Sequence, residues 1–383
     1  MAKKDKEPGV LQDELASTLA TNLNKKFKES HSKVAYFLDG DSDSPSEVTD
    51  WVSTGSTSLD LAVSNRPNGG WPVGRIVELT GLEAAGKSLL AAHALANTQK
   101  KNGIGVYIDT ESAINSEFLS AIGVDLKKML YVPLETIEDI FESIESIIET
   151  VRKGNKDTVI TIVVDSVAGA STKVEMAADF DKDGYNTSKA ILLSKAMRKI
   201  TNLIAKEKIL VIFTNQLRSK MNAMAFADPY TTAGGKAIAY HSSVRIRLAP
   251  NGQIKGKRNG KEDVLGIKTV AKVIKNRMGP PLRTAKFDIY FDRGIDDETS
   301  LLELLKELQI ADSTGAWYVL VDPSTGETLD LKFQAKTFKS IVLDNPEIYS
   351  KVKQWVYDRY IVKYKDSLDS DVEIIHSDSI IEE

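Results

Sequence analysis

One short run of this chain combines the residue types and the spacing that hold a phosphate group. The run from Gly81 to Ser88 fits the pattern G-x-x-x-x-G-K-[ST], in which small residues let backbone N–H groups converge on an anion. Lys87 can reach the β- and γ-phosphates as a flexible positive charge, and the Ser88 hydroxyl can ligate Mg²⁺. The pattern predicts a nucleotide-binding loop made of Gly81, Glu83, Ala84, Ala85, Gly86, Lys87, Ser88 and Leu89.

The stretches on either side of this loop support that interpretation. Arg75–Thr80 is predicted to be a short buried strand that enters the loop. Residues 89–101 are rich in Ala and Leu and contain neither Gly nor Pro, so they are predicted to form the helix that leaves it. The N-terminus of such a helix adds its positive dipole end to the loop. The alternative is an ordinary glycine turn, and the combination of strand, loop, Lys, Ser and helix argues against it.

A second apolar strand ends in a carboxylate. Val159–Asp165 is a β-branched run whose last residue, Asp165, can hold Mg²⁺ directly or through water when it lies beside a phosphate-binding loop. Ser88 and Asp165 are therefore the predicted metal ligands. The alternative is a strand-ending Asp with no metal to bind.

Acidic side chains also follow the strand Ile104–Asp109. Hydrolysis needs a group that orients or deprotonates water, and Glu111 at the tip of this strand is the natural candidate. Asp109 is a rival that spacing does not exclude. A third possibility is that Glu111 is simply an acidic residue on the surface.

A third strand, Ile209–Asn215, is followed by Gln216, whose amide could sense the γ-phosphate and move the loop after it. The stretch from Leu217 to Gly235 is long for a loop in a compact domain. Its cations, apolar side chains and Gly-Gly pair suit a nucleic-acid backbone, but a mobile lid over an active site fits the composition equally well. The residues of interest here are Arg218, Met221, Phe226, Gly234, Gly235 and Lys236.

Strands and helices alternate through the middle of the chain. This alternation predicts an α/β fold with a mostly parallel central sheet, helices on both faces and ligands at the carboxyl ends of the strands. The last three predicted strands follow one another without helices, so we expect the sheet to end antiparallel. The predicted strands are Arg75–Thr80, Ile104–Asp109, Met129–Val132, Val159–Asp165, Ile209–Asn215, Val244–Leu248, Gly266–Ile274 and Ala285–Phe291.

The regions outside this core divide the chain into four predicted parts. Residues 1–47 would hold an amphipathic helix from Leu11 to Phe37, for oligomerisation, and a linker. Residues 48–293 would form the ATPase and DNA-binding core. Residues 294–365 would form a small α+β domain with one strand, Trp317–Val321. Residues 366–383 would be an acidic disordered tail.

The composition excludes several classes of protein. The chain has 383 residues, no cysteine and four histidines, so disulfides, thiolate metal sites and a Cys nucleophile are excluded. The absence of cysteine fits a cytoplasmic location, and no apolar run is long enough to span a membrane. The net charge of −4 does not exclude nucleic acid, because a local cationic path is sufficient to bind it.

Several short motifs, taken together, resemble RecA-type strand-exchange recombinases. The similarity runs from about Val52 to Tyr364 and implies a RecA-like P-loop core with an N-terminal helix and a small C-terminal domain. The divergence of the chain and its acidic tail resemble a phage UvsX-type member. The motifs that carry the resemblance are 52–60, 74–78, 163–168, 196–199, 215–218, 275–277 and Gly315-Ala316-Trp317-Tyr318.

The resemblance assigns roles around ATP and Mg²⁺. Glu111 would polarise the attacking water, and Gln216 would couple the γ-phosphate to the DNA-binding loop. Phe118 would stack on adenine, although a role in the apolar core is the alternative. Lys275 and Arg277 would reach the nucleotide on a neighbouring subunit, and a solvated basic strand end is the alternative.

The resemblance also assigns DNA contacts. Ser194 and Arg198, together with Gly234 and Gly235, match phosphate-contacting positions. Met221 and Phe226 match apolar residues of the second DNA loop. The first DNA loop would be residues 175–185, but its sequence is acidic and little like that of the family.

These features imply an ATP-dependent recombinase that forms helical filaments on single-stranded DNA, pairs it with homologous double-stranded DNA and exchanges strands. Its partners would include a single-strand-binding protein and a loader. The alternative enzyme is a ring-forming relative such as a DnaB-like helicase. A nucleotide-switched binding protein with little turnover is a third class, and intact Lys87, Ser88, Glu111 and Asp165 argue against it.

Overall fold

The computed structural model describes residues 8–28, 33–38, 44–155, 157–178, 185–219 and 230–363. Two compact units make up the chain, residues 1–49 and 50–383. Met221, Phe226 and the predicted acidic tail lie outside the described residues, as does most of the predicted first DNA loop. The predicted boundaries of the four domains stay predictions.

The larger unit is built on a ten-stranded sheet in the order β12-β11-β10-β9-β3-β7-β6-β4-β5, with β8 paired to β7. The strands from β9 to β5 in this order are parallel, as the alternation of strands and helices predicts. The strands β9, β10, β11 and β12 pair antiparallel, so the predicted α/β class and its antiparallel end are confirmed. The strands are β3 (Ile76–Gly81), β4 (Ile104–Asp109), β5 (Met129–Pro133), β6 (Ile160–Asp165), β7 (Ile209–Ser219), β8 (Tyr230–Thr232), β9 (Val244–Arg258), β10 (Lys261–Asn276), β11 (Thr284–Tyr290) and β12 (Gly294–Asp296).

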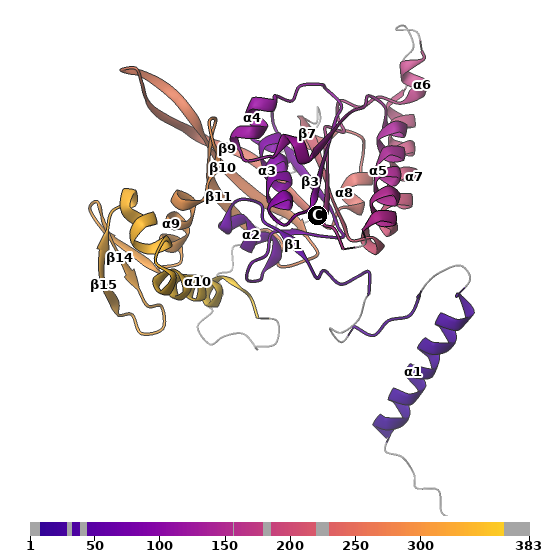
Figure 1. Ribbon diagram of the computed structural model, residues 1–383, viewed down its shortest axis with the longest axis horizontal. Coiled ribbons are helices and arrows are strands. Elements are labelled where there is room, and N and C mark those ends of the chain that lie inside the picture. The colour runs from indigo at the N-terminus through magenta and orange to yellow at the C-terminus, as the bar shows by residue number, and fades with distance from the viewer. Residues whose placement is uncertain are drawn as a thin grey trace, which may run out of the picture. The chain divides into compact units, whose positions relative to one another are not determined.

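Helices cover both faces of this sheet, and each face has its own apolar core (Figure 1). The central strands are buried on both sides, so successive residues alternate between the two cores. Val77 and Leu79 face the core that contains α3, whereas Ile76 faces the core that contains α5 and α7. The helices are α2 (Thr57–Ser64), α3 (Lys87–Lys100), α4 (Ser116–Ala121), α5 (Ile137–Gly154), α6 (Lys173–Met176), α7 (Tyr185–Lys206) and α8 (Ala237–His241).

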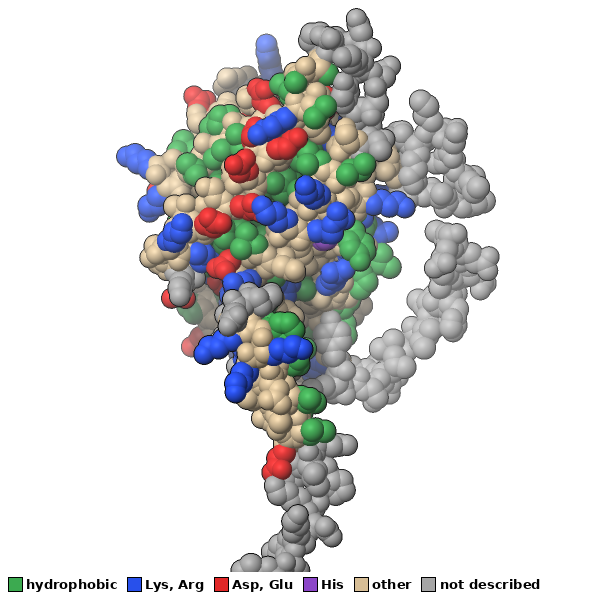
Figure 2. Space-filling model, turned by 90° about the vertical axis from the view of Figure 1, so that its right-hand side faces the viewer, with side chains coloured by type: hydrophobic (Ala, Val, Ile, Leu, Met, Phe, Trp, Pro, Cys, Tyr) green, Lys and Arg blue, Asp and Glu red, His purple; other side chains and the backbone are tan. Residues whose placement is uncertain are grey.

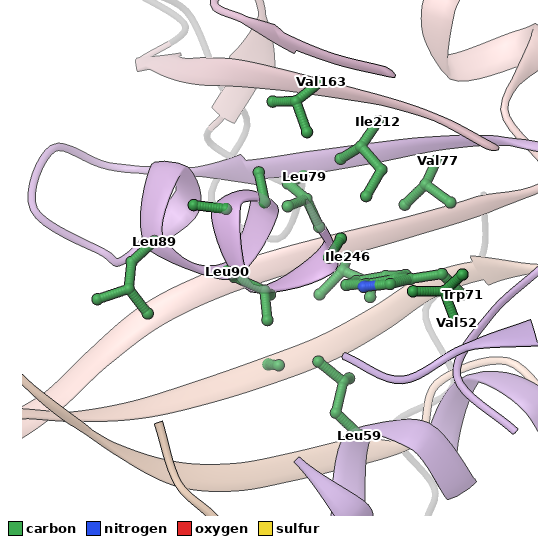
Figure 3. Close-up of a cluster of buried hydrophobic side chains, with 14 of the residues drawn as sticks. Val52, Leu59, Trp71, Val77, Leu79, Leu89, Leu90, Val163, Ile212 and Ile246 are labelled. Carbon is green, nitrogen blue, oxygen red and sulfur yellow. The ribbon is translucent and has the colours of Figure 1, made fainter. Parts of the chain in front are cut away.

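The α3 side of the sheet is packed around one large side chain. Trp71 belongs to the small two-stranded sheet of β1 (Trp51–Val52) and β2 (Trp71–Pro72), and it is fully buried. Figure 3 shows its ring lying next to Ile246 and Val52, with Leu90 of α3 projecting into the same cluster. This packing fixes α3, and therefore the loop before it, against the sheet.

Two strands of the sheet, β9 and β10, are longer than the sequence predicts. Strands Val244–Leu248 and Gly266–Ile274 were expected, but β9 and β10 form a long hairpin that reaches away from the body of this unit (Figure 1). The hairpin closes at Asn259 and Gly260, which have φ values of 53° and 79°. An Asn-Gly pair with two left-handed residues is typical of a two-residue hairpin turn, so this dipeptide is the local sequence signal for the hairpin.

The C-terminal end of the larger unit has three strands where one was predicted. Strands β13 (Ala311–Thr314), β14 (Trp317–Val321) and β15 (Thr328–Phe333) form an antiparallel sheet. Helices α9 (Asp297–Glu307) and α10 (Pro346–Tyr360) pack on it around a third apolar core, in which Phe333 and Phe338 are fully buried. Strand β13 is short and carries no apolar pattern, whereas β15 alternates apolar and polar residues at Leu329, Leu331 and Phe333, a strand signal that could have found it.

The helix of the smaller unit is shorter than predicted. It was expected over Leu11 to Phe37, but α1 spans Pro8–Lys26. The side-chain oxygen of Asn24 accepts hydrogen bonds from the backbone N–H groups of Val34 and Ala35, at 2.8 and 2.9 Å. The chain therefore folds back on the last turn of the helix instead of extending it. Leu15, Leu19 and Leu23 are exposed at helical spacing.

Two surface observations complete the fold. Among the helices in the described ranges, none has the length and apolar character needed to span a membrane. Figure 2 faces the side of the larger unit that carries α5 and α7, where acidic and basic side chains intermingle.

Candidate functional site

The carboxyl ends of the central parallel strands gather the predicted site residues at one edge of the sheet. In the strand register, Gly81 at the end of β3 lies opposite Gln216 in β7. Asp109 at the end of β4 lies opposite Asp165 at the end of β6. The structure thus brings the loop, the amide and both carboxylates to the edge where open α/β sheets bind ligands.

The helix after the loop begins without a side-chain cap. Side chains cap the starts of α2, α4 and α5, through Ser56, Asn115 and Thr136. The residue before helix α3 is Gly86, which has no side chain to cap the helix. The first turn of α3 contains no acidic residue. The first N–H groups of α3 are therefore available to an anion, and the helix dipole favours a negative charge there.

Gly86 itself cannot be replaced without disturbing this turn. Its φ is 87°, in the left-handed region that side chains rarely adopt, and an added Cβ would lie 2.6 Å from Cδ1 of Ile289. The glycine is required by backbone geometry and by a close approach to the sheet.

Lys87 lies over the loop. Its Nζ donates hydrogen bonds to the carbonyl oxygens of Gly81 and Leu82, at 3.2 and 2.8 Å. Burial lowers the pKa of Lys87, and the carboxylates of Asp165, Glu111 and Glu83 oppose that shift. The Lys87 ammonium group therefore has two carbonyl oxygens as hydrogen-bond partners and three carboxylates nearby. A bound phosphate would be a further negatively charged partner for it.

Asp165 is held on both carboxylate oxygens. The hydroxyl of Tyr107 donates to Oδ2 at 2.5 Å, and the hydroxyl of Thr214 donates to Oδ1. These donors come from the neighbouring strands β4 and β7. The orientation of the carboxylate is therefore fixed by the sheet itself.

The two rival acids after β4 have different environments. Asp109 is buried and accepts hydrogen bonds from the backbone N–H of Glu111 at 3.0 Å and from the hydroxyl of Tyr131 at 3.2 Å. Glu111 is exposed, and its Oε1 accepts a hydrogen bond from the Ser166 hydroxyl at 2.8 Å. Both acids line the cavity beside the loop, but Asp109 is buried and Glu111 is exposed, so the geometry favours Glu111 for contact with water.

A cavity of about 200 Å³ opens beside these groups. Ser88, Glu111 and Asp165 line it together with Phe118. Phe118 is half-buried, lines the cavity and also packs on the α3 core, so its two predicted roles both stay predictions. The combination of apolar and polar walls is typical of a small-molecule site.

The residues at this edge fit Mg²⁺ and a nucleotide. A hydroxyl and a carboxylate, from Ser88 and Asp165, are oxygen ligands of the kind Mg²⁺ prefers. Uncapped N–H groups and Lys87 supply the positive field that a triphosphate needs. These residues would hold the metal and the phosphates.

Next to Gln216, a buried network ties the second loop to the sheet. The Nδ2 of Asn215 donates to Glu78 Oε1 at 3.0 Å and to the carbonyl of Ala233 at 3.1 Å. Arg245 Nε lies 2.5 Å from the other oxygen of Glu78. Asn215 therefore joins the start of the loop, at the end of β7, to the point where the chain returns after β8.

The candidate DNA residues in the described part of the chain fall into two groups that meet. Ser194 and Arg198 lie on α7, whereas Gly234, Gly235 and Lys236 form the turn before α8. A Cβ on Gly234 would lie 2.6 Å from Cδ1 of Leu193, and one on Gly235 would lie 3.4 Å from Cβ of Ala190. The glycine turn therefore packs directly on α7. Arg218 is exposed near the end of β7, where it pairs with Thr231 of β8.

Lys275 and Arg277 lie away from this chain's own phosphate loop. Lys275 lies near the end of β10, opposite Arg245 of β9. Its Nζ donates hydrogen bonds to the carbonyl oxygens of Ala239 and Tyr240, at 2.9 and 2.8 Å. It lines a separate cavity of about 730 Å³ whose cationic walls are Lys236, Arg245, Arg247, Lys272 and Lys275. Burial, with Arg277 and Arg245 nearby, lowers the pKa of Lys275 to about 8.

Sequence reasoning missed the groups that position Asp165 and the second loop. Tyr107, Thr214 and Asn215 are polar residues inside apolar strands, and that irregularity is the signal that could have found them. Glu78 and Arg245 are charged residues in β3 and β9 and give the same signal. Their pairing could not be predicted because the partners lie far apart along the chain.

Comparisons with known proteins identify the family of the chain. The sequence model of the RecA N-terminal domain matches residues 17–296. Protein RecA of Streptococcus sanguinis (strain SK36) is 35% identical over 309 residues, which cover 81% of this chain and 76% of that protein. Protein RecA of Streptococcus pneumoniae (strain Hungary19A-6) is 35% identical over 309 residues, which cover 81% of this chain and 75% of that protein. The chain therefore belongs to the RecA family of ATP-dependent recombination and repair proteins.

Proposed function

We propose that this chain is a DNA-dependent ATPase that polymerises as a helical filament on single-stranded DNA, pairs it with homologous double-stranded DNA and exchanges the strands. The observation that carries the proposal is that Lys87 follows β3, Asp165 ends β6 and Gln216 lies in β7 opposite Gly81. The stretch predicted to face DNA begins with Leu217, directly after Gln216 in the chain. A change at the nucleotide would reach it through the last residues of β7, which extends to Ser219.

Each residue has a role in this proposal. ATP with Mg²⁺ would supply the phosphoryl bond that is hydrolysed. Lys87 and the first N–H groups of α3 bind the phosphates, while Ser88 and Asp165 hold the metal. Glu111, exposed beside them, orients the attacking water. Phe118 stacks on the base.

The proposal also includes a site in trans, in which residues of one subunit act on the nucleotide of its neighbour. Neither Lys275 nor Arg277 lines the cavity of Ser88 and Asp165, so they would act on a nucleotide bound to the next subunit. ATP would then stabilise the filament. A contact between different surfaces of successive subunits does not close on itself and gives an open helix.

The DNA surface of this proposal comprises α7 and the glycine turn against it. Arg198 and Lys236 would meet phosphates, and the Gly234–Gly235 backbone would approach them closely. Met221 and Phe226 would act on the bases. The cytoplasmic location, and partners such as a single-strand-binding protein or a loader, belong to the same proposal.

Strand exchange between circular single-stranded DNA and homologous linear duplex tests this function. We expect joint molecules that require ATP and homology, with a heterologous duplex as the control. The Lys87→Ala variant should give none. Unwinding of a duplex that does not depend on homology, together with closed rings in negative-stain images, would favour a helicase and overturn the proposal.

A further inference from the structure

Tyr107 contacts one of the two groups that would hold the metal ion. It is a residue of β4 with only 2% of its surface exposed, yet it lines the same cavity as Ser88 and Asp165. Its hydroxyl donates a hydrogen bond to Asp165 Oδ2 at 2.5 Å. A buried phenol needs such a partner.

The direction of this hydrogen bond is set by chemistry. An ionised carboxylate only accepts, so the single proton of Tyr107 points to Asp165.

The hydrogen bonds to Asp165 fit cation ligation. Tyr107 and Thr214 donate to its two carboxylate oxygens, one each. The lone pairs that remain on the carboxylate therefore have a fixed direction.

We propose that Tyr107 is a positioning residue for the magnesium ion, because its hydroxyl fixes the direction of the Asp165 carboxylate in the cavity that Ser88 also lines. The inference rests on the proposed nucleotide site and deepens it. Partners of metal ligands orient those ligands and tune their affinity, and losing one commonly costs 10- to 100-fold in metal affinity.

The Tyr107→Phe variant tests this proposal, because it removes one oxygen and keeps the ring. Fluorescent ADP binding is measured first in EDTA and then against added Mg²⁺, and Mn²⁺ binding to the ADP complex is measured by electron paramagnetic resonance. We expect the Mg²⁺ and Mn²⁺ dissociation constants to rise about tenfold or more. ADP affinity in EDTA should stay within about twofold, because Lys87 and the α3 N-terminus are unchanged.

Tyr131→Phe is the matched control. Tyr131 donates to Asp109 on the same edge of the sheet, but it does not line the cavity. Its removal should leave the affinity for both metals unchanged. Thr214→Val removes the other donor to Asp165 and should weaken metal binding, whereas Thr214→Ser should restore it. This pair gives an independent test if Tyr107→Phe lowers the melting temperature.

The outcomes separate the two proposals. If the wild-type protein binds no ADP with or without Mg²⁺, the nucleotide site itself is wrong. If it binds ADP with Mg²⁺ and folded Tyr107→Phe has wild-type metal affinity, only the role of Tyr107 is wrong. An equal loss of ADP affinity in EDTA would also overturn that role, because it would show damage to the phosphate loop.

Discussion

Arg245 Nε lies 2.5 Å from Oε2 of Glu78, a carboxylate whose side chain has no exposed surface. The pair joins β9 to β3 in the middle of the sheet, and Asn215 satisfies the other Glu78 oxygen from β7. Three neighbouring strands therefore share one buried charge pair. The phosphate loop begins three residues after Glu78 at Gly81, so the pair also supports the site.

Replacing Arg245 with methionine should destabilise the protein strongly. Removing one member of a buried pair leaves an uncompensated charge, which typically costs about 3–5 kcal/mol. Urea unfolding measures the loss. Lys255→Met is the control, since both Lys255 and its partner Glu262 are largely exposed, and it should change stability by less than about 1 kcal/mol. Equal effects of the two variants would contradict the structural role of the pair.

The Glu111→Gln variant should bind ATP normally but turn it over slowly. A carboxylate that orients or deprotonates water typically contributes 10²- to 10⁴-fold to the rate, and an amide cannot take the proton. Single-turnover hydrolysis and nucleotide binding separate the two effects. Glu117→Gln, on the exposed first turn of α4, serves as the control. Unchanged turnover in Glu111→Gln would move the role to another residue.

Gly234→Ala should weaken DNA binding while leaving ADP binding intact. The new Cβ would lie 2.6 Å from Cδ1 of Leu193, so either the turn or the buried Leu193 side chain would have to shift. Gly326→Ala is a matched control, because its φ of 74° is close to the 76° of Gly234 and nothing lies within 4 Å of the added Cβ. Both variants carry similar backbone strain, and only Gly234→Ala adds a clash. Fluorescence anisotropy with a labelled oligonucleotide measures the difference, and equal affinities would contradict the DNA role of the turn.

Lys275 should give the DNA-stimulated ATPase a pH dependence. Its lowered pKa of about 8 means that it is cationic below that pH and loses its charge as the pH rises through it. Glu78 opposes the shift caused by burial and by Arg277 and Arg245. If Lys275 binds phosphates of the neighbouring nucleotide, stimulation should fall between about pH 7 and 9.

The Lys275→Arg variant isolates this effect, because arginine keeps its charge throughout that range. Lys87 has the same environment in both proteins, so the difference between their pH profiles reports Lys275 alone. Stimulation in the variant should remain level where the wild type declines. Parallel profiles would remove Lys275 from the titrating site.

The sequence predicts the central sheet well because the buried strands are apolar and the loop between β3 and α3 follows a spaced pattern. The ends of elements are less predictable. Helix α1 ends at Lys26, and the Asn24 side chain accepts hydrogen bonds from the returning backbone at Val34 and Ala35. The spacing of apolar residues does not predict these hydrogen bonds. The long β9–β10 hairpin depends on pairing between strands, and its only local sequence signal is the Asn259-Gly260 turn.

The candidate site divides in the same way. Lys87, Ser88 and Asp165 are set by local motifs, so their types and spacing are enough to find them. Tyr107 and Asp165 are 58 residues apart, and Glu78 and Asn215 are 137 residues apart. Such partners are brought together only by the strand order, which no single motif specifies.

Hydrolysis of ATP by the purified protein, with and without single-stranded DNA and across a salt series, tests the central claim most directly. We expect strong stimulation by DNA that declines as salt rises, because phosphate contacts release counterions and the trans site forms only when subunits assemble on DNA. Equal turnover without DNA at every salt concentration would contradict the recombinase account.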